Sequence, residues 1–233
     1  MMGKITTQLV VTGSERRGRP KAIPPGNREW VTVIAGINAA SWAIPPFLIF
    51  ASLLASIYHL SAWHEENIPR HWAIAVSSNG WTNNELGVEW LKHFNAHAKT
   101  RFRGARRLLV LDCQECHHSL EFQELCKENN IYTLCMPPHS FHLLQSLDVG
   151  CFSLLKRAYS REVEALIRSH INHFTKLEFL PAFKAAINRA FTTANICSAF
   201  QGAGLVALQP DTVLPKLDVQ LRTPTPAALL EAP

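Results

Sequence analysis

The chain has 233 residues, which gives room for one domain of ordinary size and an appendage. Hydrophobic residues make up 47% of it and charged residues 18%, a composition that excludes general disorder. Lys and Arg number 23 against 18 Asp and Glu, so the formal net charge of +5 suits a polyanionic partner. Aspartates are few, and none of them precedes Asp112.

A β-hairpin is expected in the first quarter of the chain, after a loop over residues 13–28. Residues 30–38 are rich in β-branched side chains and residues 46–50 are apolar, which predicts two strands. No Asp, Glu, Lys or Arg occurs between Glu29 and Glu65. The apolar part of this stretch is interrupted by Ser and His, and it falls short of the ~20 apolar residues that a bilayer helix needs. We therefore expect no membrane partner.

Two long helices are expected further along the chain. Residues 82–99 place their apolar side chains on one face, and Thr82 with Glu85 matches a capping box at the helix start. Residues 147–168 predict the second helix, with basic side chains outside its apolar face. Five side chains are expected to point inward from this helix: Phe152, Leu155, Tyr159, Val163 and Leu166.

A βαβ unit lies between the two long helices. Residues 108–111 and 131–136 predict two buried strands, and residues 120–129 predict the helix that joins them. Strands connected in this way are parallel, so the whole pattern predicts an α/β fold with a mixed sheet flanked by helices. We divide the chain into a main domain over residues 1–175, a helical extension over residues 176–217 and a tail over residues 218–233.

Asp112 and Asp148 are the candidate metal ligands. Asp112 ends a buried strand, where open α/β sheets place their ligands, and Asp148 lies at a helix start, where backbone N–H groups favour a carboxylate. The 35 residues between them allow the two side chains to meet. Paired carboxylates suit Mg²⁺ or Mn²⁺, which also accept phosphate oxygens. The alternative is that each aspartate only caps the turn or helix that follows it.

The six cysteines predict reduced, mostly buried thiols, because no secretory signal peptide is visible. Cys113, Cys116 and His117 match the C-x-x-C-H string of haem attachment, and His118 adds a possible zinc donor. Covalent haem would need an export signal, and zinc would need a second ligand pair at the right spacing. Free thiols are therefore the preferred interpretation.

Basic side chains are the candidates for contact with a DNA backbone, although a solvated surface shows the same pattern. Ten residues belong to this set: Arg16, Arg17, Arg19, Lys21, Arg101, Arg103, Arg106, Arg107, Lys156 and Arg157. Three histidines are candidates for positioning a phosphate, with packing roles as the alternative: His117, His139 and His142.

Five strings of the sequence carry a family resemblance: GNREWVTVIAGINA, NGWTNNELGVEWLKHF, LLVLD followed by HHSLEF, KENNIYTLCMPPHSFHLLQSLDVGCFSLLKRAY, and GAGLVALQP. From about Met1 to Thr223 the chain resembles the DDE endonuclease domain of pogo/Tigger-type transposases, particularly fungal ones. The resemblance implies an RNase H-like fold in which three acidic residues bind two divalent metal ions. Such enzymes cleave DNA phosphodiesters and transfer the strand ends. Asp112 corresponds to the second acid and Asp148 to the third.

The chain also departs from the pattern of that family. The family's first acid lies on a strand just upstream of the position that Met1 occupies, so we expect this acid and most of its strand to be missing. Cys113 and Gln114 replace the usual Gly and His, and Ser146 stands where Pro is usual. A two-metal site clamps both reacting oxygens, so a lost ligand predicts impaired cleavage. The alternative is a domesticated, non-enzymatic nuclear module that binds DNA or protein; either reading predicts a nuclear location.

Overall fold

The structure, a computed structural model, describes residues 30–51, 69–101, 104–112, 119–137, 140–171 and 175–216. Its strands are β1 (Val31–Ile34), β2 (Phe47–Ala51), β3 (Ala73–Ser77), β4 (Arg107–Asp112) and β5 (Ile131–Met136). Its α-helices are α2 (Asn84–Ala98), α3 (Leu120–Glu128), α4 (Phe141–Leu144), α5 (Phe152–Arg168), α6 (Lys176–Ala190) and α7 (Thr193–Gly202). Four shorter helical turns are η1 (Lys99–Arg101), η3 (Leu147–Cys151), η4 (Pro210–Thr212) and η5 (Leu214–Lys216).

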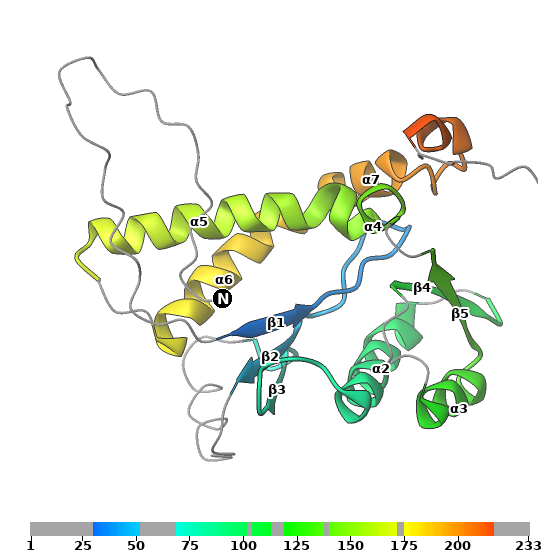
Figure 1. Cartoon of the computed structure of the whole chain (residues 1–233), viewed down its shortest axis with the longest axis horizontal. Coiled ribbons are helices and arrows are strands. Elements are labelled where there is room, and N and C mark those ends of the chain that lie inside the picture. Colours follow the sequence, from blue (N-terminus) through cyan, green and yellow to red (C-terminus); the bar gives the residue numbers. More distant parts are fainter. Residues whose placement is uncertain are drawn as a thin grey trace, which may run out of the picture.

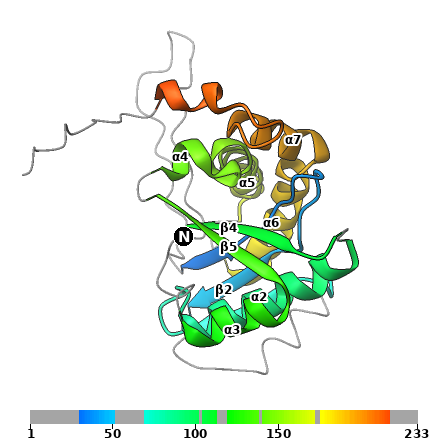
Figure 2. The ribbon, with the colours of Figure 1, turned by 90° about the vertical axis from the view of Figure 1, so that its right-hand side faces the viewer.

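The strands form two sheets. In the first sheet β1 runs antiparallel to β2, with Val31 opposite Phe50, and β3 runs parallel to β2. In the second sheet β4 and β5 are parallel, with Leu108 opposite Tyr132. The predicted hairpin and the predicted parallel βαβ unit are both confirmed. Figures 1 and 2 show the strands as a middle layer, with α5 and α6 on one side and α2 and α3 on the other. The predicted mixed α/β class is confirmed.

Helices α5 and α6 cover the outer face of the three-stranded sheet. Leu48 and Phe50 of β2 are fully buried there, and Phe50 meets Phe179 of α6 edge to face with ring centroids 5.8 Å apart. The opposite face of this sheet packs on α2 through Ile49 of β2 and Leu91 of α2, which are both fully buried. Burial on both faces explains why β2 reads as a continuous apolar run.

The two-stranded sheet is covered on one face. Leu109 and Leu111 of β4 pack into the cluster formed with α2 and α3. Alternate side chains point outward, and Leu108 is 65% exposed beside Tyr132, which is 52% exposed. The prediction of two fully buried strands is therefore wrong for this face. The physical reason is that the cluster under α5 and α6 draws side chains from β1, β2 and β3 but none from β4 or β5.

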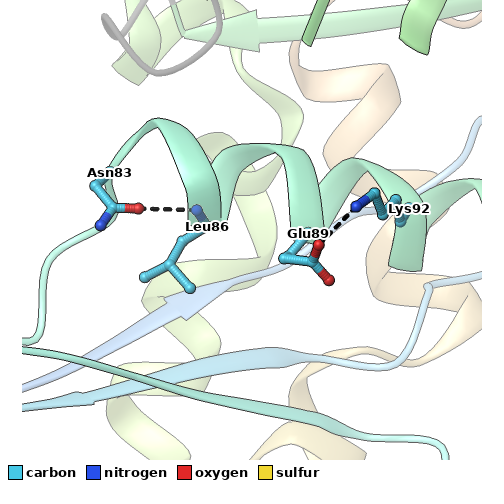
Figure 3. A network of polar contacts seen from close by, with 4 residues as sticks. All are labelled: Asn83, Leu86, Glu89 and Lys92. Atoms are coloured by element: carbon cyan, nitrogen blue, oxygen red, sulfur yellow. Dashed lines mark hydrogen bonds and ion pairs between the residues drawn. The ribbon is translucent and has the colours of Figure 1, made fainter. Parts of the chain in front are cut away.

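Helix α2 begins one residue later than the capping box predicts. Its cap is Asn83, whose side-chain oxygen accepts a hydrogen bond of 2.8 Å from the backbone N–H of Leu86 (Figure 3). Thr82 is not the cap, and its hydroxyl oxygen is buried without a hydrogen-bond partner among the described residues. One turn later the ammonium group of Lys92 lies 2.7 Å from a carboxylate oxygen of Glu89 on the exposed face. The predicted extent of the helix is otherwise confirmed.

Helix α5 confirms the second long helix in its end and in its inward face. Leu155 and Val163 are buried. Phe152 and Tyr159 are partly buried and pack against the hydrophobic cluster under α5 and α6. The helices after residue 175 are not separate from this core, since Phe179 and Phe183 of α6 stack with centroids 5.4 Å apart inside it. The proposed division at residue 175 stays a prediction. Within the described ranges, no helix has the length and apolarity needed to cross a bilayer.

The cysteines differ in part from the prediction. Cys126 and Cys151 are buried free thiols, and burial raises the pKa of each to about 11, so both stay protonated. Cys197 is free and exposed. Cys135 is disulfide-bonded, so the expectation of reduced thiols is wrong at this position.

Candidate active site

Asp112 is the last residue of β4. It lies opposite Met136 in the parallel register, at the carboxyl ends of the two strands. Because side chains alternate along a strand, Asp112 shares the outer face with Leu108 and Val110 rather than the face that packs on α2. The side chain is half-buried, and it lies where the open face of the sheet ends. A rigid strand therefore holds this carboxylate next to solvent.

Asp148 lies on a π-helical turn, Leu147–Cys151, that leads directly into α5. Gly150 allows this turn to lie against α7, because a Cβ atom at Gly150 would be 2.5 Å from the Cβ atom of Ala199. Cys151 is fully buried in the same contact, beside Ile196. Wide turns of this kind interrupt helices most often at functional sites. The local packing thus fixes the backbone of Asp148 while the residue itself stays exposed.

The two carboxylates lie within electrostatic reach of each other. Partial burial of the Asp148 carboxyl group raises its pKa, the charge of Lys156 opposes that shift, and the negative charge of Asp112 adds to it. Like charges raise a carboxyl pKa in this way only when they are close in space. The electrostatic interaction is therefore consistent with the expectation that Asp112 and Asp148 lie near each other. The roles of the two aspartates as metal ligands stay a prediction.

The donor set fits a hard divalent cation. Two carboxylates supply oxygen ligands and a local excess of negative charge, and exposure of Asp148 leaves room for water or a phosphate oxygen. Within the described ranges, no group of three or more His, Cys, Asp or Glu side chains is arranged to hold a metal ion. Among the described residues, Asp112 and Asp148 are the acidic pair of the candidate site, and water or a phosphate oxygen could act as a further ligand.

The candidate DNA-binding residues occupy different environments. Lys156 and Arg157 are exposed on α5, and Lys156 is the one whose charge reaches Asp148. Arg106 is exposed, with its guanidinium carbon 5.5 Å from the ring centroid of Tyr132. Arg101 lies elsewhere, over the ring of Trp42 at 5.2 Å.

Arg107 lies inside the fold. One of its guanidinium nitrogens donates to the side-chain oxygen of Asn95 at 2.6 Å and to the backbone oxygen of Asn129 at 3.0 Å. The same group stacks over Phe94 at 5.8 Å. These contacts tie α2 to the turn before β5, and they favour a structural role over contact with DNA. Contact of Arg107 with DNA stays a prediction.

Several predicted residues lie outside the described ranges. They are Arg16, Arg17, Arg19, Lys21, Arg103, His117 and His139, together with the C-x-x-C-H string at residues 113–117. His142 is described and is exposed on α4. Its role in positioning a phosphate stays a prediction.

Gly150, which lets the turn of Asp148 lie against α7, was not predicted as part of the site from the sequence. Gly150 carried a signal, since a glycine inside a helical pattern usually has a packing reason. Ser146 was noted only as a replacement for Pro. Its side chain is 6% exposed, and its hydroxyl oxygen has no hydrogen-bond partner among the described residues.

Comparison with known proteins identifies the family of this fold. Residues 27–200 match the DDE superfamily endonuclease family. The chain belongs to this family. Domains of the DDE superfamily use divalent metal ions and act on DNA, which agrees with the carboxylate pair described above. The RNase H-like expectation is consistent with the mixed α/β arrangement of this DDE domain.

Two fungal relatives are similar to this DDE chain. "MFS-type transporter clz9" of Cochliobolus lunatus is 72% identical over 233 residues, which is 100% of this chain and 25% of that protein. "Chaetoglobosin A biosynthesis cluster protein C" of Chaetomium globosum is 54% identical over 69 residues, which is 30% of this chain and 17% of that protein. The chain thus spans about a quarter of the length of the first relative, and that relative's name describes a much longer protein.

Proposed function

We propose that this chain acts on the phosphodiester backbone of DNA as the endonuclease domain of a pogo/Tigger-type transposase, with Asp112 and Asp148 as its metal ligands. The observation that supports this most is the electrostatic coupling of the two carboxylates across 35 residues of sequence. The family match supplies the class of reaction. Because such a substrate is genomic DNA, we also propose a nuclear location.

Each side chain of the site has a distinct task in this proposal. Asp112 holds its carboxylate at a fixed strand end, and Asp148 adds a second carboxylate from a turn that is locked against α7. A divalent ion bound there would polarise the phosphodiester and lower the pKa of a water molecule. Lys156 lies beside Asp148, where its ammonium group can contact a phosphate oxygen of the DNA.

The outer face of β4 and β5 gives the DNA a route to this pair. Arg106 and Tyr132 lie toward one end of that face and Asp112 at the other, so a strand of DNA can follow β4 with a cation near each end. From Tyr132 to Met136 the strand covers about 13 Å, at ~3.3 Å per residue. Contacts of this kind are salt-sensitive and carry little sequence specificity.

A nicking assay tests this function. Supercoiled plasmid is incubated with the purified chain and Mn²⁺, and the chain is compared with Asp112→Asn and Asp148→Asn. We expect slow Mn²⁺-dependent nicking that both variants lose, because each removes a charged ligand. Nicking that both variants retain would contradict the proposal.

The same assay tests the prediction of impaired cleavage. Slow or undetectable nicking, together with metal binding that needs both aspartates, would support it, whereas robust nicking would contradict it. DNA binding without any nicking, which persists in Asp148→Ala and is lost when the arginines of residues 16–21 and 101–107 are neutralised, would favour the non-enzymatic module instead.

A further inference from the structure

A pocket of about 460 Å³ lies away from the two aspartates and takes no part in the proposed function. It is lined by the turn between β1 and β2, the residues that lead into β3, the end of α2 with η1, and the end of α6. Its volume falls in the range of pockets that hold small organic ligands. Neither Asp112 nor Asp148 lines it.

Apolar and aromatic residues form one part of the lining, called the floor here, and polar surface makes up the larger share of the pocket. Trp42, Trp72 and Phe191 contribute rings, and Ile44 and Ile187 contribute aliphatic side chains. Trp72 is held in place by an edge-to-face contact with Phe183, with centroids 5.6 Å apart. Flat apolar surfaces of this kind suit an aromatic ring system such as a nucleobase.

The rim of the pocket is polar and carries the guanidinium cation of Arg101. Arg101, His71 and His97 lie on it, and Thr100 and Asn188 add hydrogen-bonding groups. No Asp or Glu is among the described residues that line the pocket. Arg101 is already oriented, because its guanidinium group stacks over Trp42 at 5.2 Å. The rim therefore complements an anion such as a phosphate.

The histidines of this region are close enough together for their charges to interact. Burial lowers the pKa of His97, and the neighbouring charges of His93, His71 and Arg101 lower it further. The ring of His93 lies 4.6 Å from that of His97 and is anchored on the backbone oxygen of Pro45 at 2.9 Å. A bound anion would act in the opposite direction and raise the pKa of His97, because a nearby opposite charge favours the protonated ring.

We propose that this pocket binds a nucleotide, with the phosphate at the rim formed by Arg101 and His97 and the base on the floor formed by Trp42 and Phe191. Asn188 and Thr100 also line the pocket, and an amide and a hydroxyl can hydrogen-bond the polar edge of a base. The nucleotide can come from two sources, a free nucleotide or one unit of a nucleic acid strand.

Calorimetric titration of the whole chain tests this proposal with three probes: adenosine monophosphate, a single strand of twelve deoxyadenosines, and inorganic phosphate. Binding of the nucleotide identifies a free nucleotide as ligand, and binding of the strand alone identifies a strand as the source. Either supports the proposal when it depends on the pocket. Inorganic phosphate that binds as tightly as the nucleotide would overturn it, since the aromatic floor would then contribute nothing. Absence of saturable binding by nucleotide and strand would also overturn it.

Two exposed substitutions at the rim show whether binding uses the pocket, and both leave the aromatic floor intact. Arg101→Ala should weaken binding about tenfold or more, the effect of losing one charge-assisted hydrogen bond. Thr100→Glu should weaken it by at least as much, because it places a negative charge next to Arg101, where the phosphate would bind. The matched controls are Arg168→Ala, which removes an arginine that is 80% exposed on α5, and Gln201→Glu on α7. Equal loss in the controls would overturn the proposal.

The outcome is separable from that of the proposed function. The double variant Asp112→Asn with Asp148→Asn should bind the nucleotide as the unmodified chain does, because neither residue lines the pocket. Loss of nucleotide binding in this double variant would overturn the proposal. Failure of the nicking assay has no bearing on it.

Discussion

The two sheets of this fold differ in how they are covered. The sheet of β1, β2 and β3 lies between α5 and α6 on one face and α2 on the other, and its central strand is almost fully buried. The sheet of β4 and β5 packs one face into the cluster that it shares with α2. Its other face is open, with Leu108 65% exposed. Asp112 lies on that open face. Stability and chemistry are therefore divided between the sheets: one supplies the core, and the other presents a carboxylate.

The largest expected contrast is between the outer faces of the two sheets. Phe50→Ala should lower the free energy of unfolding by about 3–5 kcal/mol, because Phe50 is fully buried against Phe179. Leu108→Ala should change it by no more than about 0.5 kcal/mol, because its side chain already meets solvent. Urea unfolding of both variants measures the difference. Equal losses would mean that the face of β4 is packed, and the contrast between the sheets would fail.

A smaller contrast concerns two buried serines in the segment that leads from β5 to Asp148. The hydroxyl of Ser140 donates to the backbone oxygen of Pro137 at 2.6 Å, whereas that of Ser146 has no partner among the described residues. Ser140→Ala should therefore lower the free energy of unfolding by about 1 kcal/mol, and Ser146→Ala should raise it by a similar amount. Thermal unfolding with van't Hoff analysis checks both signs. A loss in Ser146→Ala would show that this hydroxyl is satisfied.

The smallest expected effect is on the free energy of unfolding, through the repulsion between the carboxylates of Asp112 and Asp148. The pKa of Asp148 is raised by its burial and by Asp112, so the folded chain binds this proton more tightly than the unfolded chain. Stability attributable to this group therefore falls as pH rises from the unfolded pKa to the raised folded pKa. Asp148→Asn should stabilise the chain at pH 7 by about 0.5 kcal/mol or less, because solvent screens an exposed group.

The pH dependence of that variant provides the control. The gain in stability should vanish below the ordinary carboxyl pKa of 3.8, where both forms of the chain hold a neutral side chain at this position. Unfolding by urea at several pH values measures it. A gain that is constant with pH would contradict an electrostatic origin, and destabilisation at pH 7 would mean that Asp148 stabilises the fold, as a simple helix cap does.

The sequence predicted the elements better than it predicted their surroundings. The βαβ unit from β4 to β5 and the end of α5 follow from local hydrophobic periodicity, which is present in the sequence itself. The exposure of Leu108 and Tyr132 does not follow from it, because the sequence of an apolar strand is similar whether one or both faces of the strand are covered. The cap of α2 moved from Thr82 to Asn83, since both residue types accept the same hydrogen bond and only the backbone decides between them.

The two carboxylates of the candidate site could be predicted from the sequence, but the packing that positions them could not. Asp112 and Asp148 stand out because aspartate is rare in this chain. Asp112 ends a predicted strand, and Asp148 lies at the start of a predicted helix. The π-helical turn and the contact of Gly150 with α7 depend on tertiary packing that no local pattern records. The nucleotide-sized pocket was missed for the same reason, since Trp42, Trp72, Arg101 and Phe191 come from four distant segments.

Binding of Mn²⁺, followed by electron paramagnetic resonance, examines the carboxylate pair on which the proposed function depends. The account predicts saturable binding to the unmodified chain, and binding at least about tenfold weaker in both Asp112→Asn and Asp148→Asn, because each removes a charged oxygen ligand. The rim variant Arg101→Ala serves as the control and should bind Mn²⁺ unchanged. Equal affinity for Mn²⁺ in the unmodified chain and in both aspartate variants would contradict the account.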